Sequence, residues 1–136
     1  MPSDQDPDRG RPALIVSANP DVVDLYVLSL RNARVPVLSA GSVDEAIQLT
    51  RDRSISAIVV DVANPNVDWD VCRVLRSQAE TGVPVIVLTG WIDADARQLA
   101  ADIGCAAFIG KPASPDRVLD VVRRTRAGER DIFTVD

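Results

Sequence analysis

The sequence contains no histidine, only two cysteines and few aromatic residues. The absence of histidine excludes mechanisms that need an imidazole base, a histidine metal ligand or a phosphorylated histidine of the chain's own. The cysteines, Cys72 and Cys105, form no metal-ligand pattern, and a reducing cytoplasm is the expected location. No apolar run could span a bilayer, and residues 1–12 lack the hydrophobic segment of a signal peptide.

The chain also lacks an excess of positive charge, because 20 acidic residues outnumber 15 basic ones, the formal net charge is −5 and the isoelectric point is near 4.7. This balance argues against binding to nucleic acid or to an anionic membrane. The chain has 136 residues, of which 46% are hydrophobic and 26% charged. That is enough material for one domain with its own core, without a disulfide or a structural metal.

Short, nearly continuous apolar runs predict strands that are buried on both faces. They occupy residues 13–16, 35–40, 57–62, 84–90 and 106–110. Pro36 lacks a backbone donor, so the second run is expected at a sheet edge or at a strand start. We expect a flexible tail over residues 1–12, a single domain over 13–127 and a short C-terminal tail over 128–136.

Helical spacing fills the intervals between these runs, with Asn19-Pro20, the capping box Ser42–Glu45 and Ser114-Pro115 as start signals. The other expected helices cover residues 67–79 and 92–103. Regular alternation predicts an α/β fold with a five-stranded parallel sheet and helices on both faces. Ligands bind such sheets at the carboxyl ends of the strands, near the point where the strand order reverses.

Polar side chains stand at several of these predicted strand ends. They are Ser17 after the first run, Asp61 within the third, Thr89 in the fourth and Lys111 after the fifth. Each is ordinary alone, since strand ends are often polar and solvated. Together, a carboxylate, a hydroxyl and an ammonium suit a phosphoryl group, which the carboxylate can accept and the other two can stabilise.

Three segments are similar to the receiver domain of bacterial two-component response regulators. They are VVDVANPNVD (59–68), PVIVLTG (84–90) and GCAAFIGKP (104–112). The resemblance covers residues 13–127. It implies the (βα)5 flavodoxin-like receiver fold and a role in phosphorelay signal transduction, with no enzymatic activity of its own. The implied partner is a protein, either a sensor histidine kinase or another regulator.

The resemblance also implies a role for each matching residue. Asp61 matches the phosphoacceptor, Thr89 the switch hydroxyl, and Lys111 the lysine that pairs with the acceptor. Phe108 matches the switch aromatic, which turns inward when the threonine moves, and helix 4, strand 5 and helix 5 then change shape. The Lys111–Pro112 bond matches a bond that is cis in the family.

One departure from the family pattern concerns magnesium. Ser17 and Ala18 stand where the family has two acidic residues that help hold Mg²⁺. Mg²⁺ prefers carboxylate and phosphate oxygens, so we expect its affinity here to be weak or absent. Asn19, Asn64 and Asp68 are possible substitute ligands. Two interpretations stay open: a weakly phosphorylated or phosphorylation-independent pseudo-receiver, and a conventional receiver that switches through Asp61, Thr89 and Lys111.

The two tryptophans are a second departure. Trp69 and Trp91 are expected on loops at the rim of the site, where they would cover it, form an apolar partner surface, or pack on the nearest helix. Other function classes fit less well. The loop of residues 17–20 lacks the glycine and hydroxyl donors of a flavodoxin phosphate site, and no nucleophile elbow is present. A DNA-binding regulator would need an output domain, and the sequence predicts none after residue 127.

Overall fold

The computed structural model describes residues 10–135, so residues 1–9 of the tail expected over residues 1–12 lie outside the described part. Strands and helices alternate along the chain. The elements are β1 (Ala13–Val16), α1 (Pro20–Asn32), β2 (Val37–Ala40), α2 (Val43–Asp52), β3 (Ala57–Val62), α3 (Pro65–Gln78), β4 (Val85–Thr89), α4 (Ala94–Ile103), β5 (Ala107–Gly110), α5 (Pro115–Arg126) and β6 (Ile132–Thr134).

The strands form one parallel sheet in the order β2-β1-β3-β4-β5-β6. The order reverses between β1 and β3, since β2 lies on one side of β1 and every later strand on the other. Pro36 precedes β2, which is an edge strand, as its missing donor predicts. This is the flavodoxin-like receiver fold expected from the sequence, with one additional strand.

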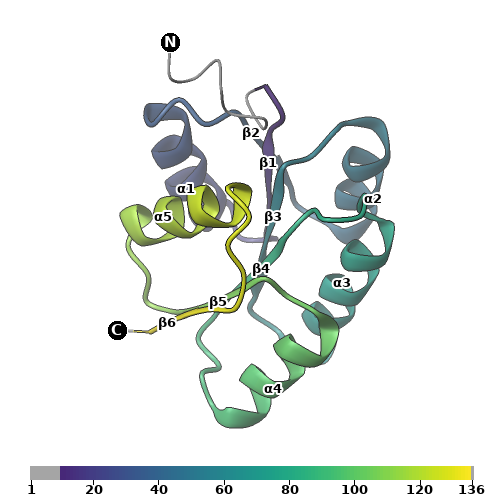
Figure 1. Cartoon of the computed structure of the whole chain (residues 1–136), viewed down its shortest axis with the longest axis vertical. Helices are drawn as coiled ribbons and strands as arrows, with labels where there is room; N and C mark the ends of the chain where they lie inside the picture. The colour runs from purple at the N-terminus through teal and green to yellow at the C-terminus, as the bar shows by residue number, and fades with distance from the viewer. Residues whose placement is uncertain (1–9, 136) are drawn as a thin grey trace.

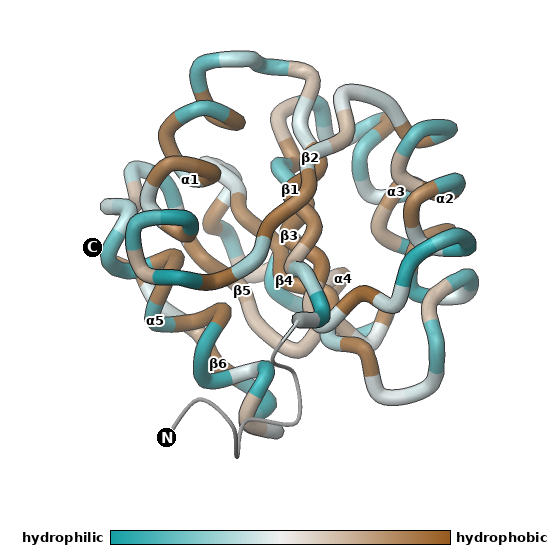
Figure 2. Tube along the Cα trace, turned by 90° about the horizontal axis from the view of Figure 1, so that it is seen from above, coloured by the Kyte–Doolittle hydropathy of each residue, from teal (hydrophilic) through white to brown (hydrophobic). Residues whose placement is uncertain are grey.

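Helices cover both faces of the sheet: α1 and α5 lie together on one face, and α2, α3 and α4 on the other (Figure 1). Each face buries its own apolar cluster. On one face, Tyr26 and Leu30 of α1 and Val121 of α5 belong to the same apolar cluster against the sheet. On the opposite face, Trp69 and Leu75 of α3 belong to the second cluster. The strands are the most hydrophobic part of the chain, while polar residues follow the outer surfaces of the helices (Figure 2).

Most helices begin where capping residues predict. The side chains of five N-cap residues accept a backbone N–H of the first turn; they are Asn19, Ser42, Asn64, Asp93 and Ser114. Glu45 closes the capping box one residue early, because its carboxylate accepts the N–H of Gly41. Helix α3 begins at Pro65, two residues before the predicted start, because the Asn64-Pro65 pair repeats the cap-and-proline signal of α1.

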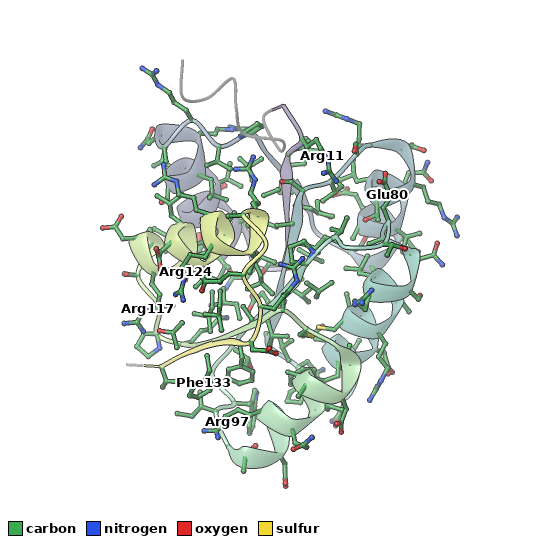
Figure 3. The ribbon with its side chains drawn as sticks, in the orientation of Figure 1. Arg11, Glu80, Arg97, Arg117, Arg124 and Phe133 are labelled. Carbon is green, nitrogen blue, oxygen red and sulfur yellow. The ribbon has the colours of Figure 1, made fainter. Side chains whose placement is uncertain are left out.

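The segment 128–136, predicted as a short tail, contains β6. Ile132–Thr134 pairs in parallel with Ala107–Ile109, so the sheet has six strands rather than five. The strand is held by its side chains as well as by its backbone. The Phe133 ring lies 5.5 Å from the Phe108 ring, and the Arg97 guanidinium of α4 lies 4.5 Å above the Phe133 ring (Figure 3).

The last residues of the expected N-terminal tail are also attached to the domain. The Arg11 guanidinium donates to the carbonyl of Ile55 at 2.7 Å, and the N–H of Ser56 donates to the carbonyl of Pro12 at 2.8 Å. The start of the chain is thereby fixed beside β3. Within residues 10–135, none of the helices has the length and apolar character needed to cross a membrane.

Candidate functional site

The register of the sheet brings the predicted site residues to one edge. Val16 of β1 pairs with Val60 of β3, so Ser17 and Asp61 follow side by side. Thr89 of β4 pairs with both Val62 of β3 and Gly110 of β5, and Lys111 comes next along the chain. The N–H of Lys111 donates to the carbonyl of Thr89 at 2.7 Å. Distant segments therefore meet because parallel strands end at a common edge.

Both carboxylate oxygens of Asp61 have partners from other strand ends. The ammonium of Lys111 donates to Oδ1 and forms an ion pair, and the hydroxyl of Ser17 donates to Oδ2 at 2.8 Å. Only 3% of the Asp61 side chain is exposed, against 28% of the Lys111 side chain. A buried carboxylate is costly unless it is paired, and these two contacts compensate it.

Thr89 lies beside this pair, but its hydroxyl is directed to the backbone. It donates to the carbonyl of Val62 at 2.8 Å and accepts the N–H of Trp91 at 3.1 Å. The residue is completely buried. The single hydroxyl proton of Thr89 is therefore used in the bond to the Val62 carbonyl. The hydroxyl that donates to Asp61 is that of Ser17.

Phe108, expected to be the switch aromatic, is 5% exposed and belongs to the apolar cluster on the α2–α3–α4 face. Its ring is in contact with Phe133 of β6. The Lys111–Pro112 bond is cis, as the resemblance implies. The sequence-predicted residues Asp61, Lys111 and Ser17 are thus in direct contact, Thr89 adjoins them, and Phe108 lies in the core next to β6.

A cavity of about 290 Å³ opens beside Asp61 and is lined in part by Ser17, Ala18, Asn19 and Asp68. The donor set does not fit Mg²⁺. Asp61 is held by Lys111 and Ser17, and Asp68 Oδ2 already accepts the backbone N–H groups of residues 63 and 64 at 2.9 and 2.7 Å. Among residues 10–135, no group of three or more histidine, cysteine, aspartate or glutamate side chains could hold a metal ion.

The two amides considered as substitute ligands have structural roles. Asn19 Oδ1 accepts the N–H of Asp21 at 3.0 Å, and Asn64 Oδ1 accepts the N–H of Asn66 at 3.1 Å. Each amide oxygen is therefore the N-cap of a helix beside the cavity. Together with Asp68, these side chains shape the loops around Asp61 rather than offering free ligands.

The tryptophans lie in different environments, contrary to the prediction that both occupy loops at the rim. Trp69 is inside α3 and only 5% exposed, and its ring packs in the apolar cluster on the α2–α3–α4 face. Trp91 follows β4 and is 52% exposed, and the adjacent Ile92 is 44% exposed. Trp91 alone lies at the surface, as expected of a rim residue.

Sequence reasoning missed one residue that positions the site. The hydroxyl of Tyr26, on α1, donates to the carbonyl of Ala113 at 2.9 Å, directly after the Lys111–Pro112 bond. Burial, and secondarily the charge of Asp61, raise the pKa of Tyr26 above its usual range. The sequence signal is faint: this is the chain's single tyrosine, on a helix otherwise packed through aliphatic residues.

Comparison with known proteins gives a consistent result. The profile of the response regulator receiver domain matches residues 13–123. The chain is 29% identical over 118 residues to the DNA-binding response regulator MtrA of Mycolicibacterium smegmatis, covering 85% of this chain and 51% of that protein. It is 32% identical over 93 residues to the probable transcriptional regulator ycf27 of Porphyridium aerugineum, covering 65% and 38%. The chain spans about half the length, or less, of the curated relatives it matches.

Solved structures show the same fold at lower identity. A response regulator from Thermotoga maritima superposes with a TM-score of 0.77 at 22% identity, covering 87% of this chain and 99% of that one. A LuxR family DNA-binding response regulator from Silicibacter pomeroyi gives 0.77 at 23% identity, covering 92% and 97%. A CheY-like receiver domain protein from Methanospirillum hungatei JF-1 gives 0.77 at 18% identity, covering 86% and 94%.

Proposed function

Because the chain belongs to the response regulator receiver domain family, we propose that it acts as a pseudo-receiver, a protein-interaction module whose recognised surface does not depend on phosphorylation of Asp61. One observation carries this proposal. Both oxygens of the Asp61 carboxylate are already bound by the protein, Oδ1 by Lys111 and Oδ2 by Ser17. The acceptor is therefore compensated without metal or phosphate.

Phosphorylation would disturb this arrangement. A carboxylate attacks a phosphoryl donor through one of its oxygens, and each Asp61 oxygen already accepts a hydrogen bond, from Lys111 or from Ser17, that would compete with the incoming group. In the family pattern an acidic pair helps hold Mg²⁺, and the bound Mg²⁺ would offset the negative charge of the incoming phosphoryl donor. Ser17 and Ala18 cannot replace that pair, because a hydroxyl is a weak Mg²⁺ ligand and a methyl group is none. Phosphotransfer to Asp61 is accordingly expected to be slow or absent.

The expected output surface supports the same proposal. A phosphorylation switch would turn Phe108 inward, but Phe108 is already buried and covered by Phe133. The outer edge of β5 is paired with β6 along its backbone. The surface between α4 and α5 therefore presents β6 rather than the edge of β5. A fixed surface of this kind suits a partner that recognises the chain as it stands.

The partner that we propose is a protein, either a sensor histidine kinase or another regulator. MtrA of Mycolicibacterium smegmatis is named as a DNA-binding response regulator, but the match covers only 51% of it. The net charge of −5 gives this chain no general attraction to the phosphate backbone of DNA. Protein recognition is the function that the matched receiver portion supports.

The convergence of Asp61, Thr89 and Lys111 favours a second candidate, a conventional phosphoaccepting receiver. The ammonium of Lys111 could move from the carboxylate to a bound phosphoryl oxygen. Thr89 could leave the Val62 carbonyl and donate to another oxygen of that group. A phosphoryl group adds about −1.5 to −2 charges, which would bias both side chains toward it.

Acetyl phosphate with Mg²⁺, followed by intact mass measurement, separates the two candidates. We expect no phosphoryl adduct on the parent chain. In the Ser17→Asp/Ala18→Asp variant the acidic pair is restored, and we expect an adduct there because the carboxylates supply metal ligands and Ser17 no longer occupies Asp61 Oδ2. Adding Asp61→Asn to this variant should remove the adduct, which controls for phosphorylation elsewhere.

A phosphoryl adduct on most of the parent chain, lost in Asp61→Asn, would contradict the pseudo-receiver proposal and establish the conventional one. Circular dichroism of each variant checks that the fold is retained. Titration of Mg²⁺ against the fluorescence of Trp69 and Trp91 gives a second readout. Saturation of the parent chain at submillimolar Mg²⁺ would also count against the pseudo-receiver.

A further inference from the structure

The fold brings together the chain's two cysteines, which no part of the proposed function uses. Cys72 lies in the middle of α3, and Cys105 lies in the turn between α4 and β5. Both are free thiols, and they pack in the same apolar cluster on the α2–α3–α4 face. Each thiol also shifts the pKa of the other, because the two side chains are within interaction range. Two sulfurs that are far apart in the sequence are therefore neighbours.

Contacts around the pair hold the two segments together. Arg76 follows Cys72 by one turn of α3, and its Nε–H donates to the carbonyl of Gly104 at 3.4 Å. Gly104 ends α4 with φ of +91°, a left-handed conformation that glycine adopts without strain. Because Gly104 is hydrogen-bonded to Arg76, the residue that follows it, Cys105, lies next to α3. The neighbourhood of the two thiols is thus set by a helix end and an arginine, independently of the thiols themselves.

Access to the two thiols is unequal. Cys72 is completely buried, whereas Cys105 is half-buried. Cys105 lines a cavity of about 570 Å³ between α4 and β6, together with Arg76, Arg97 and Arg130. A small oxidant can therefore reach Cys105 from the cavity, but it reaches Cys72 only through the core.

The electrostatic surroundings give the thiols different reactivity. Interaction with the Cys72 thiol lowers the pKa of Cys105, burial opposes this, and the Arg76 guanidinium lowers it further. The same interaction and burial raise the pKa of Cys72. Thiolate is the nucleophilic form of cysteine, so Cys105 is the reactive member of the pair and Cys72 its protonated neighbour.

We propose that Cys72 and Cys105 form a reversible disulfide when the protein meets a hydroperoxide. In the first step the Cys105 thiolate attacks a peroxide oxygen, the O–O bond breaks, and the leaving alkoxide or hydroxide takes up a proton. Cys105 becomes a sulfenic acid and the peroxide is reduced to an alcohol or water. In the second step Cys72 sulfur attacks Cys105 sulfur, the S–O bond breaks, and the departing hydroxide leaves as water with the Cys72 proton. A dithiol reductant reverses the reaction.

The disulfide would connect α3 to the entrance of β5, three positions before Phe108. A bond that forms only under oxidation in a thiol-reducing compartment is a sensing device rather than a structural staple. It needs neither phosphate nor Asp61. Trp69 lies one turn before Cys72 on α3 and reports on any repacking of that helix.

The test treats the reduced full chain with hydrogen peroxide and follows it by intact mass and non-reducing electrophoresis. We expect a monomer that has lost the mass of two hydrogens and regains it with dithiothreitol. The two single variants should differ. Cys72→Ser keeps the accessible thiol and should form a sulfenic acid that dimedone traps, whereas Cys105→Ser should not react. Dimedone separates this product from oxidation of Met1, which it does not label.

The oxidised chain should also melt about 5–10 °C higher than the reduced chain, because the bond restricts the unfolded chain. Both single variants should show no such rise. Three results would overturn the proposal: an unchanged mass in the parent chain, a disulfide that links two chains, or equal dimedone labelling of the two single variants.

Discussion

The Asp61 pocket lies at the carboxyl ends of the strands, and the outer edge of β5 lies along the side of the same sheet. The polar groups of these two regions are satisfied in different ways. At the pocket, side chains from separate strand ends satisfy one another: Lys111 and Ser17 bind Asp61. At the edge, a whole backbone segment is added, and β6 pairs with β5 while Phe133 covers Phe108. The pocket is held by charge and hydrogen bonds, and the edge by a backbone ladder and apolar contact.

The difference teaches which groups are free to respond to a signal. In the pocket, a single proton or charge change would release several contacts at once, because the partners are few and polar. At the edge, release of Phe108 would require breaking backbone pairs as well as ring contacts. The proposed fixed surface therefore depends on the edge more than on the pocket. Perturbing each region separately tests that view.

The largest effect is expected from Lys111→Met, which leaves the buried Asp61 carboxylate without its cation. Breaking a buried pair typically costs about 3–5 kcal/mol. Lys111 is 28% exposed, so water offsets part of this, and we expect a loss of about 2–3 kcal/mol in the free energy of unfolding by urea. Combining Lys111→Met with Asp61→Asn should recover most of the loss. If Lys111→Met costs as much in the Asp61→Asn variant as in the parent chain, the pair does not hold the pocket.

At the edge, Gly110→Ala should cost about 1–3 kcal/mol by overpacking. A Cβ at Gly110 would lie 2.9 Å from Val135 Cγ2 and 3.0 Å from Ile92 Cγ2, closer than such atoms normally approach. Adding Val135→Ala should recover about half of the loss in chemical denaturation. Gly41→Ala is the matched control, because no atom lies within 4 Å of its added Cβ. If Val135→Ala gives no recovery, the segment after β6 does not pack on β5 in solution.

A smaller loss is expected from Phe133→Ala, about 1 kcal/mol, because it removes the ring contact with Phe108 and the cation–π contact with Arg97. Half of Phe133 is already exposed, so little burial is lost. Hydrogen exchange of the Phe108 and Ile109 amides should accelerate in this variant while that of β3 stays unchanged. Phe133→Leu is the control for apolar bulk. Unchanged exchange in β5 would mean that β6 does not restrain the switch aromatic.

The two regions also differ in how far the sequence predicts them. The pocket follows from local signals, since Asp61, Thr89 and Lys111 each end or follow a buried apolar run and parallel strands share a carboxyl edge. What could not be predicted is the pairing: that Ser17 would donate to Asp61, and that Thr89 would turn to the Val62 carbonyl. Those contacts depend on the rotamers of Ser17 and Thr89, and each rotamer is set by neighbouring groups on several strand ends.

The edge carried a weaker signal. Residues 132–135 read Ile-Phe-Thr-Val, a β-favouring run that begins four positions after Gly128, but so short a run forms a strand only where it can pair with an open sheet edge. β5 provides that edge through long-range pairing that composition does not encode. The predicted rim position of Trp69 is wrong for a related reason. Trp69 falls inside the predicted helix 67–79, but which side of that helix faces the core depends on how it packs on the sheet. Both errors concern tertiary contacts that the local sequence leaves open.

The smallest effect is expected from Tyr26→Phe, which removes the hydrogen bond to the Ala113 carbonyl beside Lys111. One such bond contributes about 0.5 kcal/mol at neutral pH when its donor and acceptor can otherwise bind water. The pKa of Tyr26 is raised in the folded chain, so the folded state holds the phenol proton more tightly than the unfolded state does. This contribution is full below about pH 10 and is lost as the pH rises through the raised pKa. The stability difference between the parent chain and Tyr26→Phe, measured by urea unfolding, should therefore shrink above about pH 10. A difference that stays constant from about pH 7 to about pH 11 would show that the phenol does not fix the loop after Lys111.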